Sequence, residues 1–191
     1  MPDISLLKHR LRQQVANTRK QLKPEQRQTY SAQIMQYARN HLLSKGVQCL
    51  LIYKALPAEV NTDVLLVDDF FNVYVPRMLD DCGMAWVGID AASQWEKAGF
   101  GVSEPVGNTL WQPSSVKTAL LCPLLAFDHQ GHRLGMGKGY FDRWLAKHGE
   151  NIEVVGLAYS CQELSKVPIE PHDVPLATII TEHGVLSCPT V

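Results

Sequence analysis

Residues 119–148 read ALLCPLLAFDHQGHRLGMGKGYFDRWLAKH, and this stretch decides the fold class. Its first five residues form a continuous apolar run, which is typical of a strand buried on both faces of a parallel sheet. Residues 128–139 are rich in glycine and polar side chains and predict a loop, whereas residues 140–148, followed by Gly149, predict a short helix. A buried strand that leads through a loop into a helix is typical of α/β folds.

The same alternation continues on both sides of this stretch. Strands are expected at residues 48–53, 72–76, 84–89, 152–159 and 177–181. A short helix, capped by Asn61 or Thr62, is expected to run to Phe70, and the Gly- and Pro-containing residues 99–113 predict a loop. We therefore expect an α/β layered fold with a largely parallel sheet.

Two helices are expected to open the chain, over about residues 3–20 and 24–44. The first is amphipathic, with four apolar residues at helical spacing: Ile4, Leu7, Leu11 and Val15. On its polar side, three cations fall within about 40° of one another: Lys8, Arg12 and Arg19. The second helix begins at Pro24 and ends before Gly46.

Composition bounds the class of protein. The chain has 191 residues, of which 46% are hydrophobic and 19% charged, so it can bury a sizeable core and is neither disordered nor collagenous. The formal net charge of −1 argues against a globally basic nucleic-acid binder. Residues 1–45, however, carry +7 and the remainder −8. This split indicates either a basic helical pair on an acidic body or an N-terminal segment whose cations contact an anionic ligand.

Cysteine spacing and the absence of a long apolar segment bear on location. The five cysteines lie at least 27 residues apart, which argues against a disulfide framework or a zinc site and fits a reducing compartment: Cys49, Cys82, Cys122, Cys161 and Cys188. No apolar signal core opens the chain, and its longest apolar run is far too short to cross a membrane. We expect a cytoplasmic monomer without a nucleic-acid or membrane partner.

The glycine loop carries the strongest chemical signal. Gly135, Gly137 and Gly139 alternate, so the backbone can approach a ligand closely, and the free N–H groups of the following helix favour an anion. Arg133 and Lys138 add positive charge. The segment is therefore either a phosphate cradle or only a tight strand-to-helix turn. It matches neither the Walker A pattern nor the dinucleotide fingerprint, because its spacing is GxGxG.

Three acidic residues have alternative interpretations. Asp142, in the first turn of a helix, either complements the helix dipole or binds Mg²⁺, and Asp173, between two prolines, is the candidate second ligand. Glu59 either precedes a helix cap or accepts hydrogen bonds from a substrate.

Other reactive or aromatic residues have mostly structural interpretations. His129 and His132 are read as loop histidines rather than metal ligands, and Cys122 as a core residue rather than a nucleophile. Trp95 or Trp111 could stack on a planar ligand.

Taken together, these residues resemble the 5-formyltetrahydrofolate cyclo-ligase family. The most specific match is AFDxxGxRLGxGxGYFD over residues 126–142. Weaker matches occur in the family's order over almost the whole chain: Lys8-x-x-x-Arg12, EVNT at 59–62, Pro76-Arg77, His172-Asp173 and IITE at 179–182.

The resemblance implies a single domain over residues 1–191 with a three-layer α/β/α sandwich, similar to the sugar-phosphate isomerase and CoA-transferase group. It implies an ATP- and Mg²⁺-dependent enzyme that converts 5-formyltetrahydrofolate to 5,10-methenyltetrahydrofolate and releases ADP and phosphate. ATP would phosphorylate the formyl oxygen, and N10 would then close the ring. The alternatives are a non-catalytic nucleotide- or folate-binding module and an RNA-binding protein that uses the basic N-terminal segment.

The resemblance also implies roles for individual residues. ATP would bind Lys8, Arg12, Arg133, Leu134, Gly135, Met136, Gly137, Lys138, Gly139, Tyr140 and Phe141. The folate would contact Lys54, Glu59, Met136, Gly137, Lys138, Gly139 and Tyr140. Catalysis would fall to Arg133, Lys138 and Tyr140, and Mg²⁺ to Asp142 and Asp173. Phe141 and Lys138 depart from the family pattern, in which many members have a tyrosine and a glycine, respectively.

Overall fold

The computed structural model describes residues 4–79 and 83–189. Its helices are α1 (Ile4–Lys20), α2 (Pro24–Ser44), α3 (Asp63–Leu66) and α4 (Tyr140–His148), with 3₁₀ turns η1 (Gly99–Gly101) and η2 (Ser160–Gln162). The two opening helices and α4 occupy the ranges expected from the sequence.

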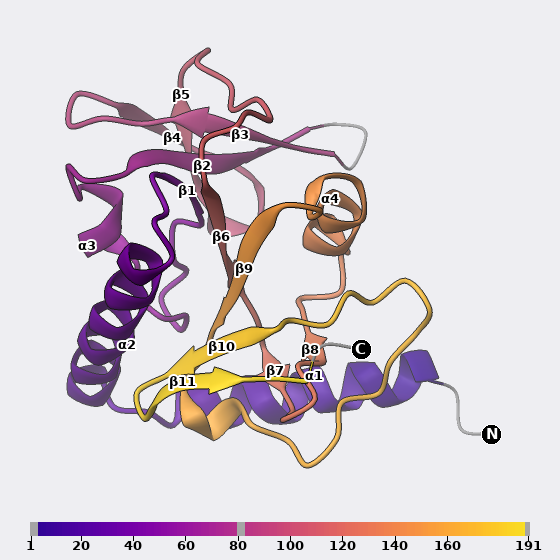
Figure 1. Cartoon of the computed structure of the whole chain (residues 1–191). Coiled ribbons are helices and arrows are strands. Elements are labelled where there is room, and N and C mark those ends of the chain that lie inside the picture. The colour runs from indigo at the N-terminus through magenta and orange to yellow at the C-terminus, as the bar shows by residue number, and fades with distance from the viewer. Residues whose placement is uncertain (1–3, 80–82, 190–191) are drawn as a thin grey trace.

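Within these described ranges the main sheet has seven strands, in the order β11-β10-β9-β6-β1-β2-β3 (Figure 1). Their bounds are β1 (Cys49–Ile52), β2 (Asn72–Met78), β3 (Met84–Gly88), β6 (Thr118–Pro123), β9 (Ile152–Leu157), β10 (Thr178–Thr181) and β11 (Gly184–Ser187). The strands from β10 to β2 run parallel, and each edge carries one antiparallel strand. The predicted α/β fold with a mainly parallel sheet is confirmed.

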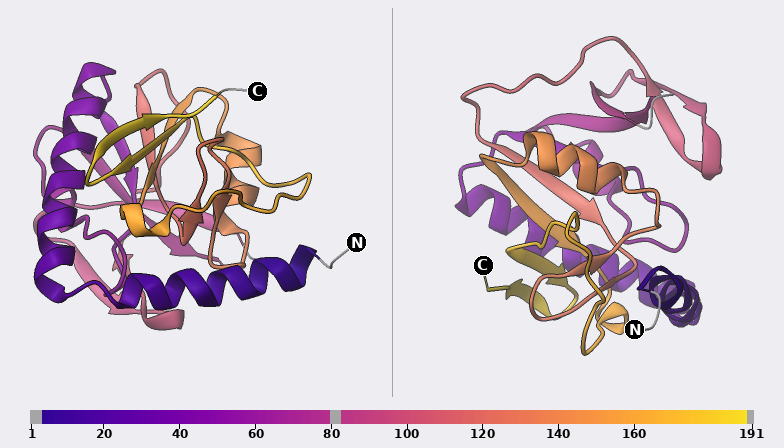
Figure 2. Two further views of the ribbon diagram at one scale, coloured as in Figure 1. Left: turned by 90° about the horizontal axis from the view of Figure 1, so that it is seen from below. Right: turned by 90° about the vertical axis from the view of Figure 1, so that its right-hand side faces the viewer.

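Helices lie on both sides of the sheet and form the expected three layers. In Figures 1 and 2, α2 and α3 cover one face, α4 covers the other, and α1 lies across the end at which the parallel strands finish. Alternate residues of β1 serve the two faces: Leu50 and Ile52 join the core under α2, whereas Leu51 joins the core under α4. The strand is buried on both faces, as its apolar sequence predicts.

The orientation of α1 differs from the simple amphipathic expectation. Its buried residues are Lys8, Val15 and Arg19, whereas Ile4, Leu6 and Leu7 remain exposed. The predicted apolar stripe therefore meets the core only from Leu11 onward. In its first half the cationic side turns inward, because that side contacts the acidic loop and cavity described below.

The sequence missed two pairs of short strands and one further strand. β4 (Gln94–Lys97) and β5 (Ser103–Val106) form a hairpin. β5 lies within the loop expected over residues 99–113, and no element was expected at β4. β7 (Ala126–Phe127) and β8 (Arg133–Leu134) pair within and beside the predicted 128–139 loop, and β11 was not predicted. These strands have two to four residues, and all four residues of β4 are exposed, so no alternating pattern marks them.

The predicted helix ending at Phe70 is also wrong: α3 spans only Asp63–Leu66. The Asp68 side chain accepts a hydrogen bond from the Phe70 N–H and ends the helix in a turn. Thr62 precedes the helix but does not cap it, because its hydroxyl donates to the Tyr53 carbonyl.

The described cysteines are all free thiols, and Cys82 lies outside the described residues. Within residues 4–79 and 83–189, no helix is both long and apolar enough to cross a membrane.

The strand order places a switch point beside β1. The chain proceeds from β1 to β2 on one side, whereas β6 pairs with β1 on the other. Loops that leave the carboxyl ends of such strands diverge and open a crevice, which is the usual ligand site of open α/β sheets.

Candidate active site

A cavity of about 620 Å³ lies at this switch point, between α1 and the segments that follow β1, β6 and β8. It brings together every residue to which the family resemblance gives a role. These are Lys8, Arg12, Lys54, Glu59, Asp173 and the whole run from Arg133 to Asp142. Segments separated by more than a hundred residues in sequence therefore line one cavity, and the role of each residue stays a prediction.

The glycine loop is shaped by a close approach of α1. Gly137 has φ +93°, and a β-carbon at this position would lie 3.1 Å from the Arg12 guanidinium carbon. Arg12 Nε also donates a hydrogen bond to the Gly135 carbonyl, at 2.9 Å. A glycine at 137 thus permits both the left-handed backbone and the contact with Arg12. The side chain of Arg12 reaches the cavity across this loop.

Arg133 and Asp142 form an ion pair in the wall of the cavity. Arg133 Nη2 lies 2.5 Å from Asp142 Oδ1, and Arg133 Nη1 also donates to the Val174 carbonyl. Arg133 is almost fully buried, and Asp142 stands in the first turn of α4. Asp142 therefore complements both the helix start and the Arg133 charge, so it is more than a solvated acid at a helix terminus.

A second ion-pair cluster joins α1 to the loop before β10. Lys8 Nζ lies 2.5 Å from Asp173 Oδ2 and 2.7 Å from Glu170 Oε2. Burial lowers the pKa of Lys8, but hydrogen bonds and the charges of the two carboxylates outweigh it and raise the pKa above its ordinary value. Burial alone would raise the pKa of Asp173. The hydrogen bond from Lys8 outweighs this effect, so the pKa of Asp173 lies below its ordinary value.

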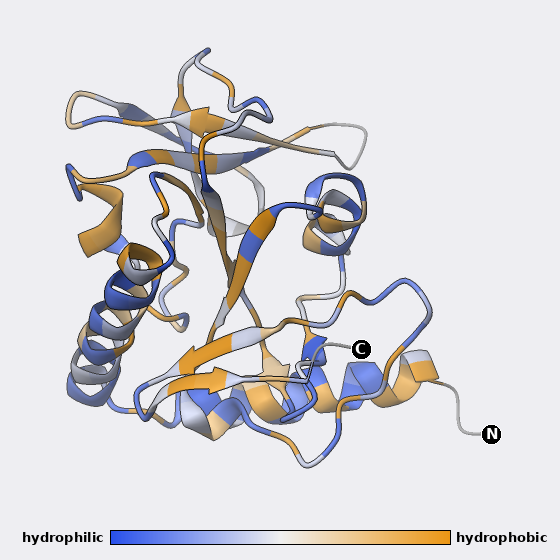
Figure 3. Cartoon of the chain, viewed as in Figure 1, coloured by the Kyte–Doolittle hydropathy of each residue, from blue (hydrophilic) through white to orange (hydrophobic). Residues whose placement is uncertain are grey.

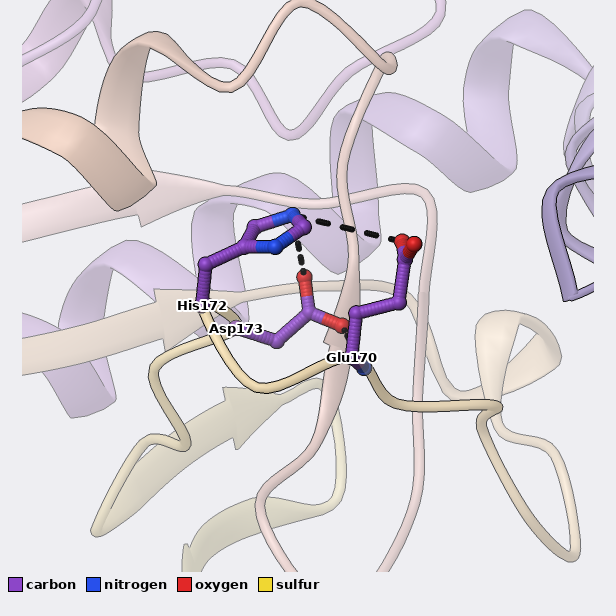
Figure 4. Close-up of side chains that lie close together, drawn as sticks. All are labelled: Glu170, His172 and Asp173. Carbon is purple, nitrogen blue, oxygen red and sulfur yellow. Dashed lines mark hydrogen bonds and ion pairs between the residues drawn. The ribbon is translucent and has the colours of Figure 1, made fainter.

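Figure 4 shows Glu170, His172 and Asp173 converging from this one loop. Their possible ligand atoms lie within 4.8 Å of one another. The His172 ring is 3.8 Å from Asp173 and 3.9 Å from Glu170. This arrangement offers carboxylate oxygens beside the cavity, where Lys8 neutralises part of their charge.

The loop that carries Asp173 is fixed by a close backbone approach at Gly131. A β-carbon on Gly131, whose φ is +81°, would lie 2.0 Å from the Leu176 carbonyl oxygen. The Leu176 N–H donates to the Gly131 carbonyl, and the buried Asp128 carboxylate accepts the Val167 N–H. The segment after β7 therefore holds the Glu170–Asp173 loop in place.

The opposite wall of the cavity comes from the segment after β1. Glu59 Oε2 accepts a hydrogen bond from the Leu56 N–H at 2.9 Å, and Tyr159 donates to the Glu59 carbonyl. Burial raises the pKa of Glu59 above its ordinary value. Lys54 lies 3.3 Å from Asp63 and 4.8 Å from the centre of the Trp95 ring. A carboxylate and a cation thus flank the apolar part of the cavity.

The structural interpretations of the remaining candidates agree with this geometry. Cys122 is completely buried, and burial raises its pKa to about 11, so it is a neutral thiol rather than a nucleophile. Trp111 packs against Trp144, with ring centres 5.5 Å apart, and does not line the cavity. His129 and His132 pair with Glu163 and Asp128.

Sequence reasoning missed Glu170, which shares Lys8 with Asp173. The available signal was its position directly before Pro171-His172-Asp173, a run already chosen for its acid. It also missed the apolar lining from Leu56, Met78 and Val102. These side chains lie on irregular or edge segments, where hydrophobicity alone does not distinguish a pocket wall from surface.

Comparison with known proteins decides the family. A model described as the 5-formyltetrahydrofolate cyclo-ligase family matches residues 5–182. The chain belongs to this family.

Two family relatives match along nearly all of the chain. It is 29% identical over 182 residues to the 5-formyltetrahydrofolate cyclo-ligase of Haemophilus influenzae, covering 91% of this chain and 96% of that one. The mouse 5-formyltetrahydrofolate cyclo-ligase is 24% identical over 199 residues, which cover 96% and 98%. Family membership therefore extends across the described fold and is not confined to the glycine loop.

A solved structure agrees with the family. The 5,10-methenyltetrahydrofolate synthetase of Aquifex aeolicus superposes with a TM-score of 0.81 at 27% identity, covering 97% of this chain and 94% of that one. The cavity of the present chain thus belongs to a fold that its family shares.

Proposed function

We propose that this chain converts 5-formyltetrahydrofolate to 5,10-methenyltetrahydrofolate, with cleavage of ATP to ADP and phosphate. The single observation that carries the proposal is the cavity at the switch point. One cavity holds an anion-favouring glycine loop with its cations on one wall and a half-buried carboxylate, Glu59, on another. Family membership supplies the identity of the two ligands.

The reaction needs one wall of the cavity to bind ATP and another to bind the folate, because phosphate passes from one to the other. The formyl oxygen on N5 is a poor leaving group. It attacks the γ-phosphorus of ATP, the bond to the ADP oxygen breaks, and the oxygen becomes part of a phosphate ester. N10 then attacks the formyl carbon and gives up its proton, and phosphate leaves with the electron pair of the carbon–oxygen bond. Such phosphoryl transfer requires chiefly positioning and neutralisation of charge.

The cations of the cavity supply that neutralisation. Arg133, Lys138 and Arg12 would oppose the phosphate charge, together with the backbone N–H groups at the start of α4. Tyr140, in the first turn of α4, would contact the transferring group. Glu59 would accept hydrogen bonds from the pterin, and Lys54 would contact the folate from the same wall.

The carboxylates of the cavity suit Mg²⁺. Asp142 and Asp173 line it, with Glu170 beside Asp173, and carboxylate oxygens are the ligands that this ion prefers. When bound, Mg²⁺ would neutralise phosphate charge. In the structure Arg133 forms an ion pair with Asp142, and Lys8 forms one with Asp173. As ligands bind, the two cations would exchange these carboxylate partners for phosphate oxygens.

A spectroscopic assay tests the proposal. Purified protein with ATP, Mg²⁺ and 5-formyltetrahydrofolate should generate the absorbance of the methenyl product, and omission of ATP should abolish it. Arg10→Ala, which removes an exposed cation of α1, is the matched control and should leave the rate unchanged. Absence of product from folded protein that still binds ATP or folate would replace the enzyme with a non-catalytic binding module.

The expected monomeric state and cytoplasmic location also belong to this proposal. Sedimentation velocity at micromolar concentration should give a single species near 21.4 kDa. A dimer under these conditions would contradict the first, and recovery of the native protein outside the cytoplasmic fraction would contradict the second.

A further inference from the structure

Two hydroxyl groups behind Glu59 form a chain of hydrogen bonds that joins three parts of the fold. Tyr159, which follows β9, donates its hydroxyl proton to the Glu59 carbonyl at 2.9 Å. Ser31 Oγ, on α2, lies 2.9 Å from the Tyr159 hydroxyl oxygen and accepts the Asn61 N–H at 3.0 Å. Because a hydroxyl has one proton and Tyr159 gives its own to a carbonyl, Ser31 is the donor to Tyr159. The chain therefore begins and ends on the backbone of residues 59–61.

The segment that carries Glu59 depends on side chains for its place. Residues 53–62, between β1 and α3, form neither helix nor strand, so their backbone groups need partners from elsewhere. The Glu59 N–H donates to the Leu56 carbonyl at 2.9 Å, and the Tyr53 hydroxyl donates to the Val60 carbonyl at 3.0 Å. Together with the two hydroxyls of the chain, these bonds fasten the segment where a neighbouring strand is missing.

Burial makes the hydroxyl chain more than a packing feature. Ser31 is 4% exposed and Tyr159 is 1% exposed, and the Tyr159 ring belongs to the apolar core under α2. A buried polar group that loses its partner keeps the cost of its desolvation, whereas a phenylalanine at the same place would carry no such cost. The hydroxyl of Tyr159 is therefore explained by the backbone that it holds and not by the core that it fills.

The fastened segment presents the Glu59 carboxylate to the cavity. Oε2 accepts the Leu56 N–H at 2.9 Å, and within the described part of the chain Oε1 accepts no hydrogen bond. Glu59 lines the cavity, whereas Ser31 and Tyr159 are not among the described residues that line it. Oε1 is thus left for a ligand, and the hydroxyl chain can act on that ligand only by placing Glu59.

We infer that Tyr159 is a positioning residue for the folate: its hydroxyl, together with that of Ser31, fixes the backbone of Glu59 so that the carboxylate meets the pterin. This inference rests on the proposed function, because it takes Glu59 to contact the pterin. A group that binds a ligand must be held within about 0.5 Å of its productive place, and rigid neighbours supply that precision. The chain of hydroxyls therefore determines affinity for the folate, whereas the glycine loop and its cations determine affinity for ATP.

Removal of one oxygen tests this division. Tyr159→Phe keeps the ring in the core and breaks the chain, so the KM for 5-formyltetrahydrofolate should rise about fivefold, as expected for one hydrogen bond of ordinary strength. The KM for ATP and kcat should stay within about twofold of the wild type, because the lost interaction serves the bound folate equally before and during the reaction. Calorimetry without ATP should show the same loss of folate affinity.

Three further variants separate positioning from a general loss of structure. Ser31→Ala should also raise the KM for the folate, and adding it to Tyr159→Phe should cost little more, because either change breaks the same chain. Ile34→Val, in the fully buried core of α2, lowers stability without touching a hydroxyl and should leave the KM for the folate unchanged. Ser44→Ala removes an exposed hydroxyl bond of the same helix and should match the wild type.

Amide hydrogen exchange gives a readout that needs no ligand. In Tyr159→Phe the Leu56 and Asn61 amides, which bond to Glu59 Oε2 and Ser31 Oγ, should exchange about tenfold faster than in the wild type. Unchanged exchange at both amides would overturn the inference, as would equal rises in KM for ATP and folate or the same rise in Ile34→Val. If the wild type binds no folate, the proposed function fails, and the exchange rates still decide whether the hydroxyl chain places Glu59.

Discussion

The two opening helices, α1 and α2, have similar lengths and opposite inner faces. α2 buries Ile34, Met35, Ala38 and Leu42 against the sheet, and its other residues are mostly hydrophilic, as the blue colouring of its ribbon in Figure 3 shows. α1 buries Lys8 and Arg19 and leaves Leu6 and Leu7 in solvent. α2 therefore covers the core of the sheet, whereas the first half of α1 lines the candidate site.

This difference explains the uneven charge of the sequence. Lys8 contacts the acidic loop at Glu170 and Asp173, Arg12 contacts the glycine loop, and Arg19 is buried in the last turn of α1. The positive charge of the N-terminal segment is thus partly directed into the molecule, where burial has a desolvation cost that only a close partner offsets. Natural proteins accept such conflicts between local pattern and environment chiefly at functional sites.

Truncation of the α2 core should have the largest effect on stability. Leu42 is fully buried, so Leu42→Ala should reduce the free energy of unfolding by about 2–5 kcal/mol, through lost burial and the cavity left behind. Urea unfolding measures the loss, and the specific activity of the folded fraction should not change. A large fall in activity per folded molecule would show that α2 also serves the site.

Removal of the Asp142 charge should have the largest effect on turnover. Asp142→Asn keeps an oxygen for Arg133 but loses a charge that we assign to Mg²⁺, so kcat should fall by about a hundredfold, or ~2.7 kcal/mol. The substitution to Asn is preferable to Ala, because Ala would leave Arg133 buried with one partner fewer. Glu150→Gln, which removes an exposed acid after α4, is the control. Near-normal turnover at limiting Mg²⁺ would exclude the metal role.

Loss of Lys8 should cost stability in a pH-dependent way. Lys8→Met leaves Asp173 and Glu170 without their cation and should reduce the free energy of unfolding by about 1–3 kcal/mol near neutral pH. The lowered pKa of Asp173 means that its contribution is present above its ordinary value near 3.8 and is lost as pH falls through the folded value.

The contribution of Lys8 to stability depends on pH in the opposite direction, because its pKa is raised. Its contribution is full below the ordinary value near 10.5 and is lost as pH rises through the folded value. The difference between wild type and Lys8→Met, measured by urea unfolding, should therefore stay constant from about pH 5 to 9 and shrink beyond both ends. A difference that changes steadily across neutral pH would contradict this ion pairing.

The outward apolar residues of α1 should have the smallest effect. Leu6 is 49% exposed, so Leu6→Gln should change the free energy of unfolding by less than about 0.5 kcal/mol and leave activity intact. Thermal unfolding and the methenyl assay measure the two quantities. A marked loss of stability would mean that the apolar stripe of α1 is covered in solution.

The sequence predicts those features of the fold, including the two opening helices, that depend on the periodicity of apolar residues. The apolar run of β6 and the extent of α1, α2 and α4 all follow from residue spacing. The inward orientation of Lys8 does not follow from spacing. Periodicity identifies a polar face of the helix but does not show that the carboxylates of Glu170 and Asp173 lie opposite it. Those acids lie 162 and 165 positions away, beyond the reach of any local pattern.

The same limit applies to the site. A resemblance in short motifs selected Lys8, Glu59 and Asp173 separately, and only the fold shows that they line one cavity. The Gly131 contact that fixes the Asp173 loop depends on a backbone carbonyl, which carries no sequence signal. Likewise, the pairing of Arg133 with Asp142 could not be read from two residues nine positions apart on different elements.

Binding of a non-hydrolysable ATP analogue with Mg²⁺ tests most directly the claim that α1 covers a nucleotide site. Calorimetry without folate should show about tenfold weaker binding to Arg12→Ala than to wild type, equivalent to ~1.4 kcal/mol. Arg10→Ala, which removes an exposed cation of the same helix, should bind as the wild type does. Equal affinity of all three proteins for the analogue would remove α1 from the nucleotide site and contradict this account.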